Sequence, residues 1–415
     1  MSSINNDPLD SQNFWELASI QVASVGILGV IFGWQLKNQF GIGDSIVAIG
    51  IGNLIQWLIG LVIIKMSSSN HIDAIENVKK YLGKGSAIGA MLTLIIACLF
   101  WFVYQLDAGI QGINHIFPTD NGIRDNVLWG TALGLCASFL GVNGIRLIKR
   151  MNVILFPVLI VSQIYALQFY HIETPISWGF SLTALGFVVL LTLVGTINLP
   201  TFFRHSRSMA DSVLALTVIF FFNIFTQLSS VFIDFDQIIS FFLNSNIALR
   251  VLLTLFVVFL VINNLLRNIY FASACWRSPT LQSLRFSNEY AIIGIAGTFA
   301  FFFIPATPPV IFVKDLITDF IANLGLVLLI TFMVRVIIRR KPQTFGMMVG
   351  SASWLIGCIA ATILSLQNPG QTIPNLFISL GLTALFYLMV IYIEIAIWSI
   401  KKLMNMKHSI ASDDQ

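Results

Sequence analysis

The stretch FWELASIQVASVGILGVIFGWQL, residues 14–36, decides the fold class of this chain. It is a predominantly apolar run of more than about 20 residues, long enough to cross a ~30 Å hydrocarbon core as a helix. Similar runs recur as far as Ile400, and we expect twelve membrane-spanning helices. Their expected extents are 14–36, 42–65, 87–114, 127–144, 152–170, 180–203, 211–232, 249–274, 289–305, 316–336, 346–366 and 375–400.

The composition agrees with an all-α membrane protein. The chain has 415 residues, of which 57% are hydrophobic and 10% charged, and its mean hydropathy is +0.86. Little of the chain lies outside the expected spans, so a soluble catalytic domain or a nucleic-acid-binding domain has no room. The longest connection, 66–86, carries apolar residues at helical spacing and predicts a short helix at the membrane interface.

Lysine and arginine are distributed very unevenly between alternate connections. Of the 23 in the chain, 18 lie in one set of connections, at the span ends that flank them or in the C-terminal tail, 4 lie in or beside the other set, and Arg267 lies deep inside a span. Connections rich in these residues stay cytoplasmic, so both termini are predicted to be cytoplasmic and the protein to reside in the inner (cytoplasmic) membrane. The polar, acidic segment 1–13 is unlike a signal peptide, which predicts that the first span is retained.

Histidine and cysteine placement argues against an enzyme. The five histidines all lie in connections or tails, and none forms an HxxxH or HExxH pair. The four cysteines lie within or at the ends of apolar spans, as reduced packing residues do. The chain has no GxxxxGK[ST] motif, which excludes ATP-driven pumping by this chain alone. We therefore expect neither catalysis nor a bound cofactor or metal.

Two glycine-bearing segments occupy spans one and six: GILGVIFG at 26–33 and GTINLP at 195–200. Transporters place ion and substrate sites where a spanning helix is broken, because the freed backbone groups can bind ligands. The alternative is that the glycines only allow helices to pack closely. The two segments are five spans apart, which predicts an inverted repeat of spans 1–5 and 6–10 with two helices appended.

The expected organisation has five parts. A cytoplasmic N-terminal tail, 1–13, precedes a first five-helix repeat, 14–170, and a second inverted repeat, 171–336. Helices 11 and 12 follow at 337–400, and a cytoplasmic tail covers 401–415.

Several motifs, in order, resemble those of the nucleobase:cation symporters of the cytosine permease and hydantoin permease type, within the amino acid–polyamine–organocation superfamily. GTINLPTFFRHSRS, 195–208, is similar to the family stretch in which Gly-Thr precedes Asp-Phe-x-Arg and a further Arg. GIRLIKRMNVILFPVLI, 144–160, is similar to a Gly-Ile-Arg/Lys-x-Ile/Leu linker that enters a Pro-Leu helix. Gly52-Asn53 and the Tyr-x-Ala-Ser at 270–273 also fit. The resemblance covers the first ten spans and implies a symporter that imports a nucleobase or hydantoin-like solute by alternating access.

Two departures from the family pattern bear on the solute. The glycine-containing stretch ahead of the family's Gly-Thr is replaced by VVLLTLV, 188–194, so the floor of the site is more apolar. The family's acidic residue after Gly-Thr is Pro200 or Thr201 here. A solute other than a nucleobase therefore stays open, including an amino acid or amine carried by the same fold.

Span three contains LFWFVYQLDAGIQG, 99–112, in which Trp101 and Gln105 share one helix face with Tyr104 beside them. An indole can stack on a planar heterocycle while an amide bonds to its edge. The resemblance implies the same, because the corresponding Trp-x-x-x-Gln of the hydantoin permease binds substrate. The alternative is a packing tryptophan and an interhelical glutamine. The predicted substrate site lies between spans 1, 3, 6 and 8 and comprises Trp101, Tyr104, Gln105, Gly26, Thr192 and Gly195.

The candidates for ion coupling are Asp107, Asn263, Asn264 and Arg267. Asp107 is an intramembrane carboxylate, either a proton carrier or an acid facing the outer vestibule. With Tyr270 aligned, Asn263 and Asn264 stand where sodium-coupled members of the family have hydroxyls. Counting residues from the span ends puts Asp107 and Arg267 roughly 20 Å apart in depth, so they should not pair.

Arg267 has three alternative roles. It either snorkels toward the cytoplasm, or holds a carboxylate, or takes the place of a cation. A guanidinium within one turn of a sodium site would repel the ion, so we expect no sodium site of the family kind. Proton coupling through Asp107 and ion-independent uptake with Arg267 as a built-in cation are both left open. We expect the protein to work as a monomer in the bilayer; the broken-helix pair argues against a channel.

Overall fold

The computed structural model describes residues 12–68, 72–117, 122–170, 176–277, 288–303, 308–338 and 344–413. This part of the chain forms fourteen α-helices and a short 3-10 helix, with two isolated β-bridges and no strand. The helices are α1 (Phe14–Phe40), α2 (Ile42–Ser68), α3 (Ala74–Leu82), α4 (Lys84–Ile116), α5 (Gly122–Gly141), α6 (Gly144–Ala166), η1 (Leu167–Phe169), α7 (Leu182–Phe203), α8 (Met209–Phe232), α9 (Phe235–Leu243), α10 (Ile247–Trp276), α11 (Glu289–Phe303), α12 (Pro308–Ile338), α13 (Thr344–Gln367) and α14 (Thr372–Asp413).

Each of the twelve expected spans coincides with one helix, namely α1, α2, α4 to α8 and α10 to α14. Eight of the helices are long and apolar enough to cross a membrane by length and composition alone. Two shorter apolar helices, Asn126–Gly141 and Glu289–Phe303, fall at the fourth and ninth spans. The prediction of an all-α, multi-pass membrane protein with twelve spans is confirmed.

Two short helices lie outside the spans. α3 begins at a capping box in which the Asp73 carboxylate accepts from the Glu76 N–H at 2.8 Å, and its apolar face is buried. It is the helix that the sequence predicts in the connection 66–86. α9 was not expected. It follows α8, the second span of the second half, as α3 follows α2 in the first half, and both helices have nine residues.

The helices pack in pairs that repeat between the two halves. α1 packs on α8 and α2 on α7; α4 packs on α11 and α5 on α10; α1 packs on α6 and α7 on α12. The counterpart of each helix is the helix five spans away in the other half: α7 for α1, α8 for α2, α10 for α4, α11 for α5 and α12 for α6. Replacing both helices of a contact by their counterparts gives the second contact of the same pair, so that α1 on α8 becomes α7 on α2. This is the packing pattern of a five-plus-five repeat.

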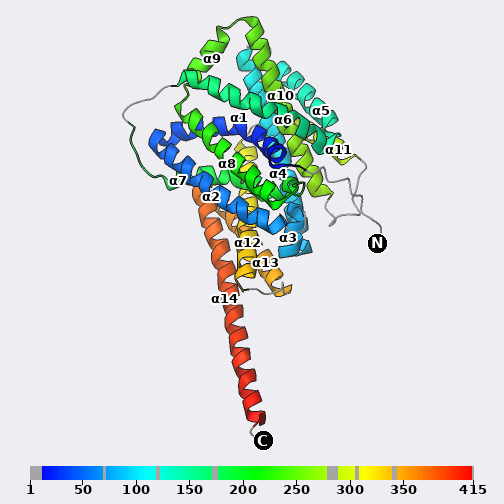
Figure 1. Ribbon diagram of the computed structural model, residues 1–415, viewed down its shortest axis with the longest axis vertical. Coiled ribbons are helices and arrows are strands. Elements are labelled where there is room, and N and C mark those ends of the chain that lie inside the picture. The colour runs from blue at the N-terminus through cyan, green and yellow to red at the C-terminus, as the bar shows by residue number, and fades with distance from the viewer. Residues whose placement is uncertain are drawn as a thin grey trace.

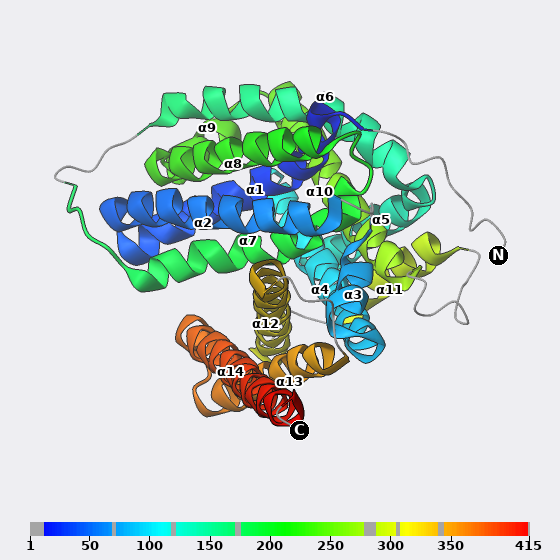
Figure 2. The same ribbon diagram turned by 60° about the horizontal axis from the view of Figure 1, so that its bottom comes forward.

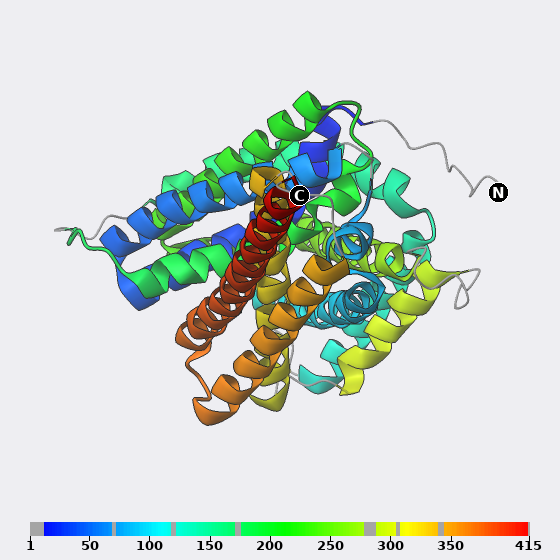
Figure 3. The same ribbon diagram turned by 90° about the horizontal axis from the view of Figure 1, so that it is seen from below.

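The two halves interleave into one body. Figure 2 shows α1, α2, α6, α7 and α8 running side by side, with α3, α4, α5 and α11 beyond one end of that group. α12, α13 and α14 pack on one another, as seen from below in Figure 3, and α12 also packs on α4 and α7. α14 continues well past the rest of the molecule (Figure 1). Its 42 residues include part of the segment that the sequence assigned to a C-terminal tail.

Both glycine segments run as continuous helix in the described backbone. α1 extends through 26–33 and α7 through 195–200 without the interruption that the sequence predicted. A glycine keeps its backbone N–H, so it does not by itself remove a helical hydrogen bond, and in an apolar environment the helix satisfies its own backbone. Gly29 and Gly33 instead allow close packing: a methyl group on Gly33 would overlap Ser230 and the carbonyl oxygen of Gln227 in α8.

Candidate functional site

Trp101 and Gln105 lie on the inner face of α4. Nine residues turn an α-helix by about 180°, so Trp101 lies opposite Leu92, and Gln105 opposite Ile96. Leu92 and Ile96 are 50% and 43% exposed and mark the outer face of the helix. The half-buried Trp101 and Gln105 therefore point in among the other helices rather than outward.

The indole of Trp101 contacts the ring of Tyr104, one turn along α4. The two rings meet edge to face, with centroids 5.7 Å apart and planes at 90°. This contact uses one edge of a ring pair, and the flat apolar face of an indole is the surface on which a planar ligand can stack.

Gln105 is linked across the protein to α10. Asn268 Nδ2 donates a hydrogen bond of 2.6 Å to Gln105 Oε1. Within the described part of the chain the amide hydrogens of Gln105 and the carbonyl oxygen of Asn268 make no other hydrogen bond. A donor beside an acceptor complements a ring edge that carries an N–H next to a C=O. Asn268 was not among the predicted site residues, although it lies four residues after Asn264 on the same helix face.

The neighbouring asparagines Asn263 and Asn264 have opposite surroundings. Asn263 exchanges two hydrogen bonds with Asn152 of α6, each 2.8 Å long, and both residues are fully buried. Asn264 is 4% exposed, and its carbonyl oxygen has no hydrogen-bond partner. Only Asn264 therefore has an oxygen that is free for a ligand.

Contacts on either side fix the direction of Asn264. At 100° per residue, Asn264 lies about 60° around α10 from Arg267 and about 40° from Asn268. Arg267 contacts Gln21 of α1, and Asn268 contacts Gln105 of α4. Asn264 lies between them, so it points toward the space between α1 and α4, where the sequence placed the substrate.

Arg267 does not snorkel to the surface. It is 8% exposed, and its Nη2 donates to Gln21 Oε1 at 3.0 Å. The guanidinium carbon lies 5.7 Å from the ring centre of Phe202 in α7 and 5.9 Å from that of Phe271. Its Nε has no hydrogen-bond partner. The structure thus holds a positive charge between α1, α7 and α10.

Asp107 does not join this group. Gln111 Nε2 donates to Asp107 Oδ2 at 2.7 Å, within α4 itself. Asp107 is two residues from Gln105 and therefore about 200° around the helix from it, so its carboxylate points away from the Gln105–Asn268 pair.

The predicted 20 Å depth difference between Asp107 and Arg267 is wrong. The bond between Gln105 and Asn268 places positions 105 and 268 side by side, and Asp107 and Arg267 are within two residues of them. Counting from the ends of apolar runs fails because it does not fix the sliding of one helix along another. The two charges do stay apart, because they project from different faces.

Gly26, Thr192 and Gly195 lie in α1 and α7, at positions whose side-chain surroundings are outside the described residues. Their part in the substrate site stays a prediction.

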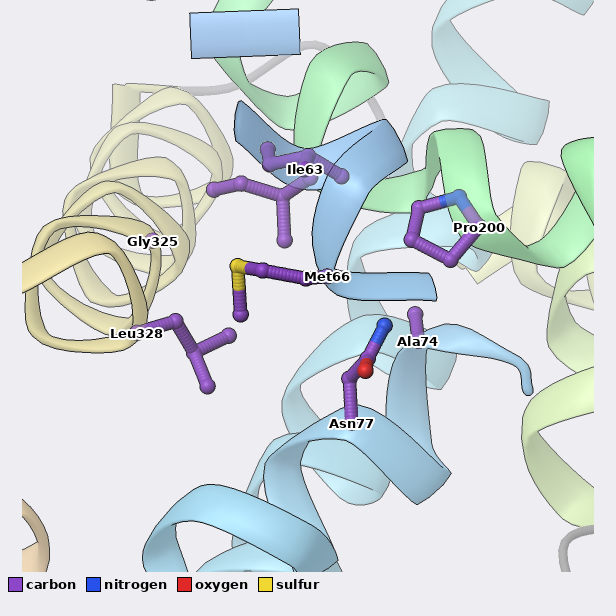
Figure 4. Close-up of a pocket in the computed structure, with 8 residues that line it drawn as sticks. Ile63, Met66, Ala74, Asn77, Pro200, Gly325 and Leu328 are labelled. Atoms are coloured by element: carbon purple, nitrogen blue, oxygen red, sulfur yellow. The ribbon is translucent and has the colours of Figure 1, made fainter. Parts of the chain in front are cut away.

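A separate gap opens where α2, α3, α7 and α12 meet (Figure 4). Its empty volume is about 280 Å³ including the open mouth, and none of the predicted site residues lines it. The lining is apolar except for Asn77, whose side-chain oxygen is buried without a hydrogen-bond partner. Ile63, Met66, Ala74, Asn77, Ile197, Pro200, Gly325 and Leu328 form its wall.

The helix ends on the side predicted to be cytoplasmic are tied together. Gln12 N–H donates to the His205 carbonyl at 2.8 Å, which joins the start of α1 to the end of α7. Lys149 of α6 pairs with Glu16 of α1 at 3.5 Å. Arg204 pairs with Asp73, the cap of α3, also at 3.5 Å. Burial raises the pKa of Asp73, despite the opposing effect of Arg204.

No protein-family model and no curated protein sequence matches this chain. Its fold does match solved structures of transporters. One match is Mhp1, a nucleobase-cation-symport-1 family transporter, in a closed conformation with bromovinylhydantoin bound. The two structures compare with a TM-score of 0.64 at 16% sequence identity, over 91% of this chain and 92% of that one. The inward-facing conformation of Mhp1 gives 0.63 at 16% identity, over 94% and 95%. A Na⁺-coupled sialic acid symporter, substrate-bound and outward-open, gives 0.63 at 13% identity, over 90% and 88%.

At these identities the likeness establishes the fold. The resemblance to nucleobase:cation symporters that the sequence motifs indicate is confirmed at the level of the fold.

Proposed function

We propose that this protein is a secondary active transporter that imports a small polar heterocyclic solute, nucleobase-like or hydantoin-like, by alternating access. The observation that carries the proposal is the inward-facing Trp101 one turn from the Gln105–Asn268 hydrogen bond, in the fold of secondary transporters. It works in the inner (cytoplasmic) membrane, as a monomer with both termini in the cytoplasm.

Each part of this site matches one property of such a solute. The Trp101 indole stacks on the ring, the Gln105 amide donates to a ring carbonyl, and the Asn268 oxygen accepts from a ring N–H. Asn264 adds a buried acceptor on the same side of α10. The ring face is thereby recognised by α4, and the ring edge by α4 and α10 together, so the closure of one helix onto the other can respond to solute.

We further propose that uptake does not depend on sodium. The oxygen of Asn263 is engaged by Asn152, which leaves Asn264 as the one asparagine of the pair with a free carbonyl. Arg267, three residues farther along α10, supplies a positive charge that repels sodium. Arg267 then acts as a fixed cation between α1 and α10. Proton coupling through Asp107 is the alternative, and the direction of that side chain, away from Gln105, weighs against it.

The experiment is a thermal-shift screen of nucleobases, hydantoins and amino acids on purified wild-type protein and on Trp101→Ala. We expect planar heterocycles to stabilise the wild type, and Trp101→Ala to weaken their binding by ~1 kcal/mol or more without unfolding the protein. Trp178→Ala is the matched control, because Trp178 is 66% exposed and lies outside the helices.

Two outcomes would contradict the proposal. Stabilisation by amino acids alone would favour an amino acid or amine transporter of the same fold. If Trp101→Ala binds heterocycles as tightly as the wild type, the Trp101 indole is not part of the substrate site.

A further inference from the structure

Arg267 carries a positive charge that nothing in the described part of the chain neutralises. The side chain has five N–H donors, and it makes one hydrogen bond, to the neutral amide of Gln21. Its Nε is buried without a partner. No carboxylate of the described residues lies within 4.0 Å of it.

Two arginines of the described residues that do form ion pairs show the contrast. Arg204 pairs with Asp73 at 3.5 Å and Arg277 with Glu289 at 3.1 Å. Both of those acids are almost fully buried, whereas the side chains of Arg204 and Arg277 are 26% and 40% exposed, so the fold provides a carboxylate even to arginines that are partly exposed. It provides none at Arg267, which is the most deeply buried of the three side chains.

An uncompensated buried charge is costly. Desolvation of such an ion costs several kcal/mol even after the protein relaxes, and ionisable groups at membrane depth mark the paths of substrates and ions. The two aromatic rings beside Arg267 recover part of this cost but bring no negative charge. A bound anion would supply the counter-charge that the described residues lack.

The position of the guanidinium says which site that ligand occupies. Its neighbours are Gln21 of α1, Phe202 of α7, Phe271 of α10 itself and, electrostatically, Cys98 of α4. These are the four helices around the candidate site. Cys98 shares the inner face of α4 with Gln105, about 10 Å along the helix from it. The charge is thus at the floor of the same site.

We propose that Arg267 is an anion subsite of the transport site and that the solute is a planar heterocycle bearing a carboxylate. This inference rests on the proposed function and narrows its solute. The ring lies on Trp101, its polar edge meets Gln105 and Asn268, and the carboxylate is held by the guanidinium. The planar fork of an arginine matches a carboxylate with two parallel hydrogen bonds. Chloride shares this anion chemistry without the ring, so the experiment must separate the two.

The test compares pairs of ligands that differ in the carboxylate: uracil with orotate, and hydantoin with hydantoin-5-acetate. Affinities are measured calorimetrically on the full chain in chloride-free buffer, for wild type, Arg267→Gln and Arg267→Lys. A charge-assisted contact predicts that the wild type binds the carboxylate member about tenfold to 100-fold more tightly. In Arg267→Gln the two affinities should become equal, whereas Arg267→Lys keeps the charge and should retain part of the preference.

The outcomes separate this inference from the proposed function. Trp101→Ala should weaken both members of a pair and leave their ratio intact. If uncharged heterocycles bind as well as carboxylates in the wild type, or if Arg267→Gln keeps the preference, the anion subsite is wrong and the proposed function stands. If chloride alone stabilises the wild type but not Arg267→Gln, with no advantage for the carboxylate ligands, the anion is chloride and the solute assignment is wrong. If no heterocycle binds, both proposals fail.

Discussion

Replacing Asn263 by leucine should destabilise the protein, whereas the same change at the adjacent Asn264 should not. The two residues have the same side chain, lie on the same helix and are both buried. They differ in their partners: Asn263 forms a reciprocal pair with Asn152, and the oxygen of Asn264 bonds to nothing in the described structure. The comparison therefore isolates the contribution of the Asn152–Asn263 hydrogen bonds to the free energy of unfolding.

The magnitude follows from the bonds lost. Interhelical hydrogen bonds in membrane proteins contribute about 0.6 kcal/mol on average and up to about 1.7 kcal/mol, so two of them give a coupling of about 1–3 kcal/mol. Asn263→Leu also leaves the oxygen of Asn152 buried and unpaired, although Asn152 Nδ2 keeps its bond to the Ile148 carbonyl. We expect a total loss of about 2–3 kcal/mol. Asn264→Leu removes an unpaired carbonyl and should change stability by less than about 1 kcal/mol, in either direction.

The assay is unfolding in mixed micelles with increasing dodecyl sulfate, followed by tryptophan fluorescence. A double-mutant cycle with Asn152→Leu, Asn263→Leu and the double variant extracts the coupling energy. The double variant should be less destabilised than the sum of the single variants, because neither leucine leaves a buried amide behind.

Additive effects in that cycle would show that the pair does not form as the structure has it. If Asn263→Leu and Asn264→Leu lower the free energy of unfolding equally, the oxygen of Asn264 is not free. The role proposed for it in solute binding would then be wrong as well.

Three further predictions follow from other contacts. Gly33→Ala should destabilise by about 1–3 kcal/mol, measured in the same assay, because the added methyl overlaps Ser230, whereas Gly50→Ala, with open space around it, should not destabilise. The raised pKa of Asp73 means that the folded protein binds the proton of this carboxyl more tightly than the unfolded chain does. Protonation of Asp73 therefore stabilises the fold fully below about pH 3.8, and this stabilisation is lost as the pH rises through the folded pKa. Asp73→Asn, which keeps the N-cap of α3, should therefore reduce the fall in melting temperature from acidic to neutral pH; an unchanged slope would contradict the burial of this carboxyl. Solute uptake into proteoliposomes should be equal with sodium and with potassium outside, and a requirement for sodium would refute the fixed-cation proposal.

Local patterns in the sequence determined the membrane class and most of the elements. Apolar runs of spanning length gave twelve helices, because a helix is the one open-chain structure that satisfies its own backbone in lipid. The helical spacing of apolar residues in the connection 66–86 predicted α3. Helical periodicity alone placed Trp101 and Gln105 on one face, and their orientation away from Leu92 and Ile96 agrees with an inner face.

The tertiary structure decided which polar side chains meet. Nothing in the sequence distinguishes Asn263 from Asn264; Asn152, 111 residues away, satisfies one and not the other. The sliding of α4 against α10 set the pairing of Gln105 with Asn268 and overturned the depth estimate for Asp107 and Arg267. Periodicity fixes directions around a single helix, because the turn per residue is constant. It carries no information on the register between helices, which depends on packing between residues far apart in the chain.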